Sequence, residues 1–279
     1  MCTIVLLRNA VPGYPLAIVA NRDEYLDRPS ETVLERENGL ILAPKDLKRG
    51  GTWIGVNKWG VFAGLTNRNG VVGKPERVSR GDLPNLALGE RTAEAAFRKI
   101  RDTFLTGNRL NGFYLVIADR ENAYLFGGDG LHLTHRVVEE EVLAVTNRGV
   151  GTVGDVGLPE TPRRVSHIIS QWQGMQYLFS GSYQWSPERN EEEVVTTLKN
   201  LISIHDEDRH GTCVNEPEIG YGTKSSSIIL LKPEPEDPKA DLEWVYSHRE
   251  RQGDGHVCDL PFTTEYWSSY ADYPPVEVK

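Results

Sequence analysis

Short apolar runs separated by turn residues dominate the first third of the chain. Residues 2–7 and 16–21 flank the segment "NAVPGYP", in which Pro12 and Gly13 favour a turn, so these two runs are predicted to form a β-hairpin. Further strands with pleated alternation are predicted at residues 40–43, 52–56 and 61–66. The pattern indicates a sheet built from consecutive hairpins.

A helical period replaces this pattern over residues 83–105, where apolar residues recur every three or four positions. Thr92 is placed to cap a helix, and Gly89 is placed to separate two helices. Apolar runs between turn residues then return, and we expect them to form one four-stranded meander of residues 113–118, 123–126, 131–134 and 142–146.

The second half of the chain repeats the order of helices followed by strands. Thr161 and Asn190 are predicted to cap two helices, and a hairpin is predicted to end the pattern. The predicted helices cover residues 162–172 and 191–204, and the predicted strands cover residues 225–231 and 242–247. Separate blocks of strands and helices favour an α+β fold in which two antiparallel sheets are covered by helices.

Because the chain shows no repeat and no low-complexity tract beyond the acidic, proline-containing connector "KPEPEDP", we expect a single domain over residues 1–279, with residues 259–279 as a loosely packed tail. The net charge of −9 opposes binding to nucleic acid, and no apolar run is long enough to span a bilayer. Three cysteines without a CxxC pair suit a reducing compartment. We therefore expect a cytoplasmic protein without a structural disulfide.

Cys2 directly follows Met1 at the start of the first predicted strand. If Met1 is removed, Cys2 carries both a thiol and a free α-amine, whose pKa of about 8 allows it to act as a general base without a histidine. Such a residue attacks an amide or thioester carbonyl and forms an acyl-enzyme. The alternative is that Cys2 is a small apolar residue at the start of a buried strand, and retention of Met1 would remove the base.

A charged cluster follows the second apolar run, and an antiparallel hairpin brings Asn21, Arg22 and Asp23 close to Cys2. In that position Arg22 would favour the thiolate, Asp23 would orient the amine and Asn21 would donate a hydrogen bond. The alternative is a solvated ion pair between Arg22 and a neighbouring carboxylate, which contributes little to stability.

Two other predicted strands end on the repeated sequence "TNR", at Asn67 and at Asn147. Side-chain amides at these ends are suited to stabilising an oxyanion. The arginines that follow them, Arg68 and Arg148, are suited to attracting a substrate carboxylate or phosphate. Because asparagine also favours turns, the alternative is that both amides only terminate strands.

These residues belong to a larger set of segments that resembles the Asn-Arg-Asp-Glu (NRDE) family, which includes the transport and Golgi organisation proteins. The segments run in order along nearly the whole chain: "MCTIVLL", "ANRDE", "GGTWIGVN", "GVFAGLTNR", "SRGDLP", "NGFYLVIAD", "VTNRG" and "YGTKSSSIIL". The resemblance implies the N-terminal-nucleophile (Ntn) hydrolase fold, a four-layer αββα sandwich of two antiparallel sheets between helical layers.

A more distant similarity to choloylglycine hydrolases and cysteine-type penicillin acylases implies roles for individual residues. Cys2 would be the nucleophile, Arg22 and Asp23 its supporting pair, and Asn67 and Asn147 the oxyanion-binding and amine-orienting groups. The similarity leaves open whether Asn21 or Arg22 stands at the position of the hydrolase arginine.

Other residues are expected to line the same pocket. Thr223 and Ser225 begin a predicted strand there, and Trp53 is expected to pack over the pocket or the core. Lys224 stands where relatives often have arginine, and this weakens the expectation of an anion-binding role at that position.

Two functions follow from the resemblance. The first is hydrolysis or acyl transfer at a non-peptide amide or thioester of a small molecule. The second is a non-catalytic carrier of haem, or of acyl-coenzyme A or another lipid. We expect no metal site and no resident cofactor in the first case, with haem as a ligand in the second.

Overall fold

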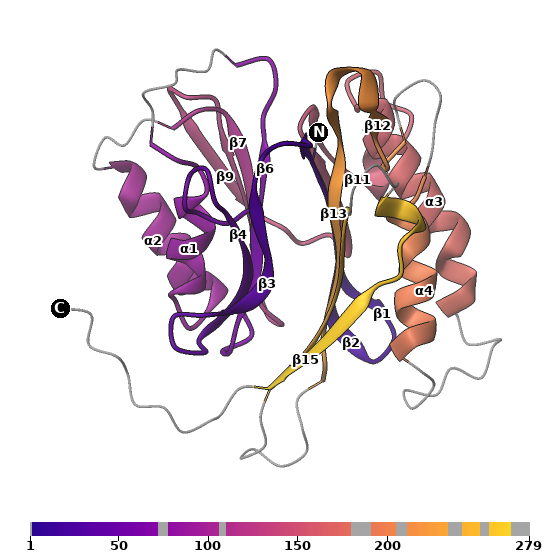
Figure 1. Ribbon diagram of the computed structural model, residues 1–279, viewed down its shortest axis with the longest axis horizontal. Helices are drawn as coiled ribbons and strands as arrows, with labels where there is room; N and C mark the ends of the chain where they lie inside the picture. The colour runs from indigo at the N-terminus through magenta and orange to yellow at the C-terminus, as the bar shows by residue number, and fades with distance from the viewer. Residues whose placement is uncertain are drawn as a thin grey trace.

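The computed structural model describes residues 2–71, 78–105, 110–179, 191–204, 211–233, 242–251 and 257–268. In these parts of the chain, two antiparallel sheets lie face to face between two pairs of helices (Figure 1). The predicted α+β fold class, a four-layer αββα sandwich, is confirmed. Within the described residues no helix combines the length and hydrophobicity needed to cross a membrane.

The first sheet has the strand order β11-β10-β1-β2-β13-β14-β15, and the short strand β12 also pairs with β13. Its strands are β1 (Thr3–Val11), β2 (Tyr14–Tyr25), β10 (Val142–Thr146), β11 (Gly149–Thr152), β12 (Asn215–Glu216), β13 (Tyr221–Leu231), β14 (Glu243–Glu250) and β15 (Thr263–Ser268). The predicted hairpin of residues 2–7 and 16–21 is confirmed by the pairing of β1 with β2, which sets Thr3 opposite Asn21.

The second sheet follows the order of the sequence from β3 to β9. Its strands are β3 (Ser30–Arg36), β4 (Ile41–Asp46), β5 (Ile54–Asn57), β6 (Phe62–Asn67), β7 (Phe113–Ala118), β8 (Ala123–Gly128) and β9 (Leu133–Val137).

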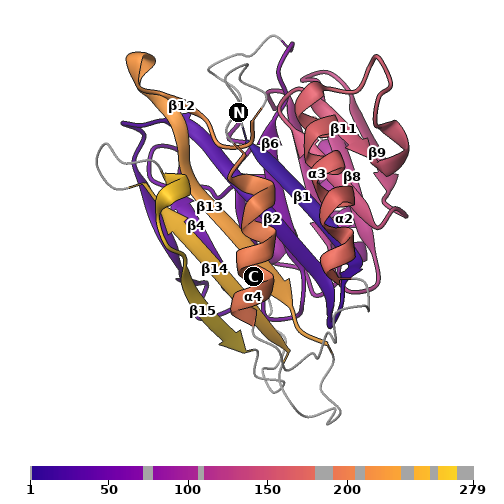
Figure 2. The ribbon, with the colours of Figure 1, turned by 90° about the vertical axis from the view of Figure 1, so that its right-hand side faces the viewer.

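Helices cover the outer face of each sheet (Figures 1 and 2). Helices α1 (Asp82–Leu88) and α2 (Ala93–Leu105) pack on the second sheet, whereas α3 (Arg163–Phe179) and α4 (Glu191–Lys199) pack on the first. Gly89 separates α1 from α2 as predicted, and the Thr92 hydroxyl accepts a 3.1 Å hydrogen bond from the Ala95 amide. Asn190 lies outside the described residues.

The central strands are buried on both faces because they lie between the two sheets on one side and the helices on the other. In β1, Ile4 and Leu6 pack between the sheets, whereas Val5 and Leu7 pack against α3 and α4. This two-sided burial explains why β1 is a continuous apolar run and does not alternate with polar residues. The pleat also decides which side chains reach the space between the sheets.

The prediction of one meander from residues 113 to 146 is wrong. Strands β7, β8 and β9 form a meander in the second sheet, but β10 crosses to the first sheet and pairs with β1. Strand β9 is largely exposed, whereas all five residues of β10 are buried. A run of five buried residues fits beside the central strand β1, where both of its faces are covered.

Part of the segment expected to be a loosely packed tail is a strand. Strand β15 pairs with β14 along residues 263–268, and Trp267 is buried. The indole nitrogen of Trp267 donates a 3.0 Å hydrogen bond to Glu35 Oε1 of β3, so β15 also contacts the second sheet.

The expectation that no structural disulfide forms is also wrong. Cys213 and Cys258 are disulfide-bonded at a sequence separation of 45, and they pack with the buried Val257. A pairing of such separation leaves no local signal in the sequence. The disulfide removes the cysteine-based part of the argument for a reducing compartment.

Candidate active site

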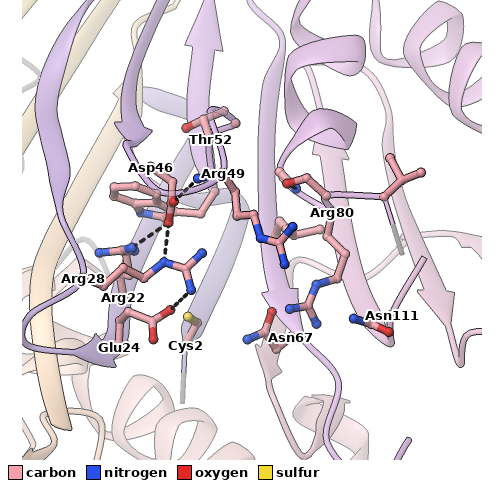
Figure 3. Close-up of a pocket in the computed structure, with 16 residues that line it drawn as sticks. Cys2, Arg22, Glu24, Arg28, Asp46, Arg49, Thr52, Asn67, Arg80 and Asn111 are labelled. Carbon is pink, nitrogen blue, oxygen red and sulfur yellow. Dashed lines mark hydrogen bonds and ion pairs between the residues drawn. The ribbon is translucent and has the colours of Figure 1, made fainter. Parts of the chain in front are cut away.

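A cavity of about 190 Å³ opens at one end of the space between the two sheets. Figure 3 shows Cys2 among the side chains of both sheets that line it. The described residues that line it are Cys2, Arg22, Glu24, Arg28, Asp46, Arg49, Gly51, Thr52, Trp53, Leu65, Asn67, Val78, Ser79, Arg80, Gly81 and Asn111.

The pleat of β2 sends alternate residues of the cluster "NRDE" to opposite faces of the first sheet. Arg22 and Glu24 share the side of Ile18 and line the cavity. Asn21 and Asp23 share the other side, towards the helical layer, and do not line it. The structure therefore separates the cluster into a cavity pair and a buried pair.

Cys2 precedes β1 and shares the parity of Ile4 and Leu6, which directs its side chain between the sheets. Its backbone nitrogen donates a 2.9 Å hydrogen bond to Asn147 Oδ1, and its thiol donates to the Asp23 carbonyl at 3.8 Å. Burial raises the pKa of the Cys2 thiol, the Asp23 charge adds to the rise, and Arg22 opposes it. A thiol in this position requires a base to become a nucleophile.

Arg22 of the first sheet pairs with a carboxylate of the opposite sheet. Its Nη2 donates to Asp46 Oδ2 at 3.1 Å, and its guanidinium carbon lies 4.1 Å from the ring centroid of Trp53. Arg28 Nε donates to the same Asp46 oxygen at 2.7 Å, and Arg28 Nη1 pairs with Glu24 Oε2 at 3.3 Å. Burial acts to raise the pKa of Asp46, but the hydrogen bond and charge of Arg28 outweigh it and hold this pKa below its usual value.

The opposite wall of the cavity carries Arg49, Arg80, Asn67 and Asn111, whose polar groups point into the cavity (Figure 3). Arg80 Nη1 donates a 2.9 Å hydrogen bond to the Gly112 carbonyl, and burial lowers the pKa of Arg80. Arg49 and Arg80 come from two loops in close contact, since a Cβ on Gly51 would lie 2.5 Å from the Gly81 carbonyl carbon.

The buried pair anchors β2 to the layer behind the first sheet. Asn21 Nδ2 donates to the carbonyls of Ile202 and Thr212, each at 2.8 Å. Asp23 Oδ1 accepts a 2.6 Å hydrogen bond from Thr223 Oγ1, and Asp23 Oδ2 forms an ion pair with Arg164 Nη1 at 3.3 Å. Asn21, Asp23 and Thr223 thus hold the strand from behind.

The other predicted residues divide between the cavity and the surface. Asn67 and Trp53 line the cavity, and Ser225 lines a space of about 10 Å³ that also touches Cys2. Arg68 lies over the Tyr114 ring at 5.4 Å and Arg148 is exposed, and neither lines the cavity.

Sequence reasoning missed several residues of the site: Glu24, Arg28, Asp46, Arg49, Arg80, Asn111 and Arg164. A period of two along β2 would have grouped Glu24 with Arg22. Arg80 stands in the segment "SRGDLP" that carries part of the family resemblance, but a loop residue gives no sign of the strand that it faces.

Within the described part of the chain, no three His, Cys, Asp or Glu side chains are grouped as metal ligands. Among the described side chains that line this cavity, Cys2 is the only one of a type that ligates haem iron.

Known proteins of similar sequence and structure were compared with this chain. A family model described as Transport and Golgi organisation 2 matches residues 1–237. The Transport and Golgi organization 2 homolog of Mus musculus is 34% identical over 260 residues, and that of Homo sapiens is 28% identical over 260 residues. Each alignment covers 83% of this chain and 88% of the relative.

Among solved structures, penicillin V acylase from Agrobacterium tumefaciens superimposes with a TM-score of 0.53. The match covers 95% of this chain and 85% of the acylase at 14% sequence identity. At this identity the similarity shows a shared fold, and it confirms the predicted Ntn-hydrolase-like sandwich.

Proposed function

The chain belongs to the transport and Golgi organisation 2 family, and from this premise we propose that it is an N-terminal-nucleophile cysteine hydrolase or acyltransferase. Its substrate would be a small molecule with a non-peptide amide or a thioester. The observation that carries the proposal is the position of Cys2, whose thiol lines the cavity while its nitrogen is bound by Asn147 Oδ1 at 2.9 Å.

The general base in this proposal is the α-amine of Cys2, which becomes free when Met1 is removed. Such an amine has a pKa of about 8, so a useful fraction is neutral near pH 7. Asn147 Oδ1 would hold the amine with its lone pair towards the thiol. The raised pKa of the thiol makes this base necessary, because little thiolate is present without it.

In the acylation step the amine takes the thiol proton, and the sulfur forms a bond to the substrate carbonyl carbon while the π electrons move to oxygen. Collapse of this tetrahedral intermediate breaks the bond to the leaving nitrogen or sulfur, which receives the proton from the ammonium. Water or another acceptor then attacks the carbonyl carbon of the acyl-cysteine and loses its proton to the amine. The carbon–sulfur bond breaks, the acyl product leaves, and the sulfur takes the proton back from the ammonium, which regenerates Cys2.

Two groups of the cavity are placed to support the developing charges. Asn67 lies beside Cys2 in the cavity, and we assign to its side-chain amide the stabilisation of the oxyanion (Figure 3). Arg22 lowers the pKa of the thiol and thereby favours the attacking thiolate. In this proposal Asp23 positions the thiol of Cys2. Its backbone carbonyl contacts the thiol, and its carboxylate is bound to Arg164.

The test combines intact mass with chemical trapping. We expect loss of Met1, selective alkylation of Cys2 by iodoacetamide, and turnover in a panel of penicillin V, acyl p-nitroanilides and acyl thioesters. Cys2→Ala should abolish both labelling and turnover, whereas Arg98→Gln on the exposed face of α2 serves as the matched control. Cys213 and Cys258 provide an internal control, because they should label only after reduction.

Full retention of Met1 without turnover in the panel would contradict the proposal and favour the carrier of haem or acyl-coenzyme A. The structure offers no specific observation for that carrier, which stays a prediction. A cytoplasmic location is part of the proposal, and imaging of a tagged full-length chain tests it.

A further inference from the structure

The cavity has a charge opposite in sign to that of the whole chain. The chain has a net charge of −9, yet four arginines and two carboxylates line the cavity within the described residues. Both carboxylates, Glu24 and Asp46, pair with Arg28, and Asp46 also binds Arg22. The negative charge is therefore concentrated on one side, and the positive excess lies on the side of Arg49 and Arg80.

We propose that this side of the cavity, formed by Arg80 and Arg49 with the amides of Asn67 and Asn111, is a subsite for an anionic group of the substrate. The group would be a carboxylate or a phosphate, and the inference rests on the proposed function because it names the substrate class of that same site. Figure 3 shows the four polar groups directed into one region beside Cys2.

The first argument is the desolvation of Arg80. Its side chain is half-buried, and within the described residues its Nη1 donates to a neutral acceptor, the carbonyl oxygen of Gly112 at 2.9 Å. Removal of a guanidinium from water is unfavourable unless an opposite charge compensates it. Burial accordingly lowers the pKa of Arg80. An anion at this wall would supply the missing compensation.

The second argument is an unused donor on the other side of the cavity. Arg22 is 5% exposed, and its Nη1 has no hydrogen-bond partner among the described residues although Nη2 binds Asp46. A buried polar atom without a partner is uncommon in folded proteins, and a bound ion is one explanation for it. Arg22 and Arg80 both line the cavity, so an anionic compound between them would meet donors on two sides.

The cavity places the proposed subsite close to the thiol. Its volume is about 190 Å³, and it opens at one end of the space between the sheets. Because the thiol and Arg80 line the same small cavity, the anionic group must lie a few bonds from the carbonyl that Cys2 attacks. The geometry favours an amide or thioester whose anionic group lies near the scissile carbonyl.

A pair of reagents of nearly equal shape tests the subsite. Iodoacetate and iodoacetamide both alkylate a thiol with loss of iodide. Iodoacetate carries a carboxylate where iodoacetamide carries a neutral amide. We expect the rate ratio of iodoacetate to iodoacetamide at Cys2 to be higher in the native chain than in the chain unfolded in urea. Arg80→Gln should lower the native ratio by about threefold or more, because it removes a nearby positive charge.

The controls separate charge from folding. Arg80→Lys should keep most of the preference because it keeps the charge, and Arg98→Gln on the exposed face of α2 should keep all of it. A ratio equal in the wild type, in Arg80→Gln and in the unfolded chain would overturn the proposal. Thermal unfolding of each variant shows whether a lost preference for iodoacetate comes from misfolding.

Competition then assigns the class of anion. Stronger protection of Cys2 by inorganic phosphate assigns phosphate, and stronger protection by succinate assigns carboxylate. If Cys2 is inert to both reagents, calorimetric binding of these ions that is lost in Arg80→Gln supports the subsite, and its absence in the wild type overturns it. A preference for iodoacetate without any amide or thioester turnover would keep the subsite and contradict the proposed hydrolase.

Discussion

Asp23 links the candidate nucleophile to the helical layer behind it. Its carbonyl contacts the Cys2 thiol, and its carboxylate forms an ion pair with Arg164 of α3. Both side chains are almost fully buried, with exposures of 4% for Arg164 and 0% for Asp23. A buried pair of this kind gives little net stability, but the removal of one partner leaves an uncompensated charge in the interior.

We therefore predict that Arg164→Met lowers the free energy of unfolding by about 3–5 kcal/mol. The double variant Asp23→Asn with Arg164→Met should lose much less than the sum of the two single variants, because neither charge is then left alone. Urea unfolding of the four chains measures this coupling. Additive losses would show that the two side chains do not depend on each other.

The residues around Cys2 show what a period of two can and cannot reveal. The hairpin that brings Arg22 near the thiol was predictable from two apolar runs and one turn. The alternation of side chains inside "NRDE" was also predictable from the sequence, and it places Arg22 and Glu24 on one face of the sheet and Asn21 and Asp23 on the other. The partners Asp46 and Arg164 were not predictable, because they come from a different sheet and from α3.

At the scale of elements, the disulfide supports the segment that holds β2 from behind. Cys213 lies between Thr212, whose carbonyl binds Asn21, and Val214, whose amide donates to Thr223 Oγ1 at 2.9 Å. The bond to Cys258 fixes this segment to the short helical turn of residues 257–259.

Replacement of both cysteines, Cys213→Ala with Cys258→Ala, should lower the free energy of unfolding by about 2–4 kcal/mol, since a closed loop restricts the unfolded chain. Urea unfolding without reductant measures the loss. A reducing agent should destabilise the wild type and leave the double variant unchanged. In the unfolded, unreduced wild type we expect one reactive thiol, and three reactive thiols would contradict the bond.

The elements that sequence reasoning placed correctly are those with strong local patterns. The period of α2 and its Thr92 cap identify a helix without any tertiary information. The partner of β10 could not be found in this way, because a short apolar run fits a central strand of either sheet. Strands β3 and β15 were missed because polar residues occupy most of their positions, and pairing with β4 and β14 decides their conformation.

At the scale of the whole molecule, a few polar contacts join the two sheets around an apolar interior. The Trp244 indole donates to the Asn57 carbonyl at 2.9 Å, and the Thr32 hydroxyl lies 3.1 Å from His248 Nε2. At the cavity, the contact is the ion pair of Arg22 from β2 with Asp46 from β4. The candidate active site is therefore also a place where the sandwich is held closed.

This double role predicts a dependence of stability on pH. The pKa of Asp46 is lower in the folded chain than its usual value, so its carboxylate stabilises the fold above about pH 4, and this stabilisation is lost as the pH falls through the folded pKa. Asp46→Asn should be less stable than the wild type at pH 7, and the difference should shrink at about pH 3.

Urea unfolding at the two pH values measures this change, and Asp102→Asn on the exposed surface of α2 provides the matched control, with a small expected effect at both values. If the difference in the free energy of unfolding between Asp46→Asn and the wild type stays constant with pH, the stabilising role of the Asp46 charge is contradicted. Because Asp46 also binds Arg22 and Arg28, the same variant should alter the reactivity of Cys2, and sheet closure and thiol reactivity should change together.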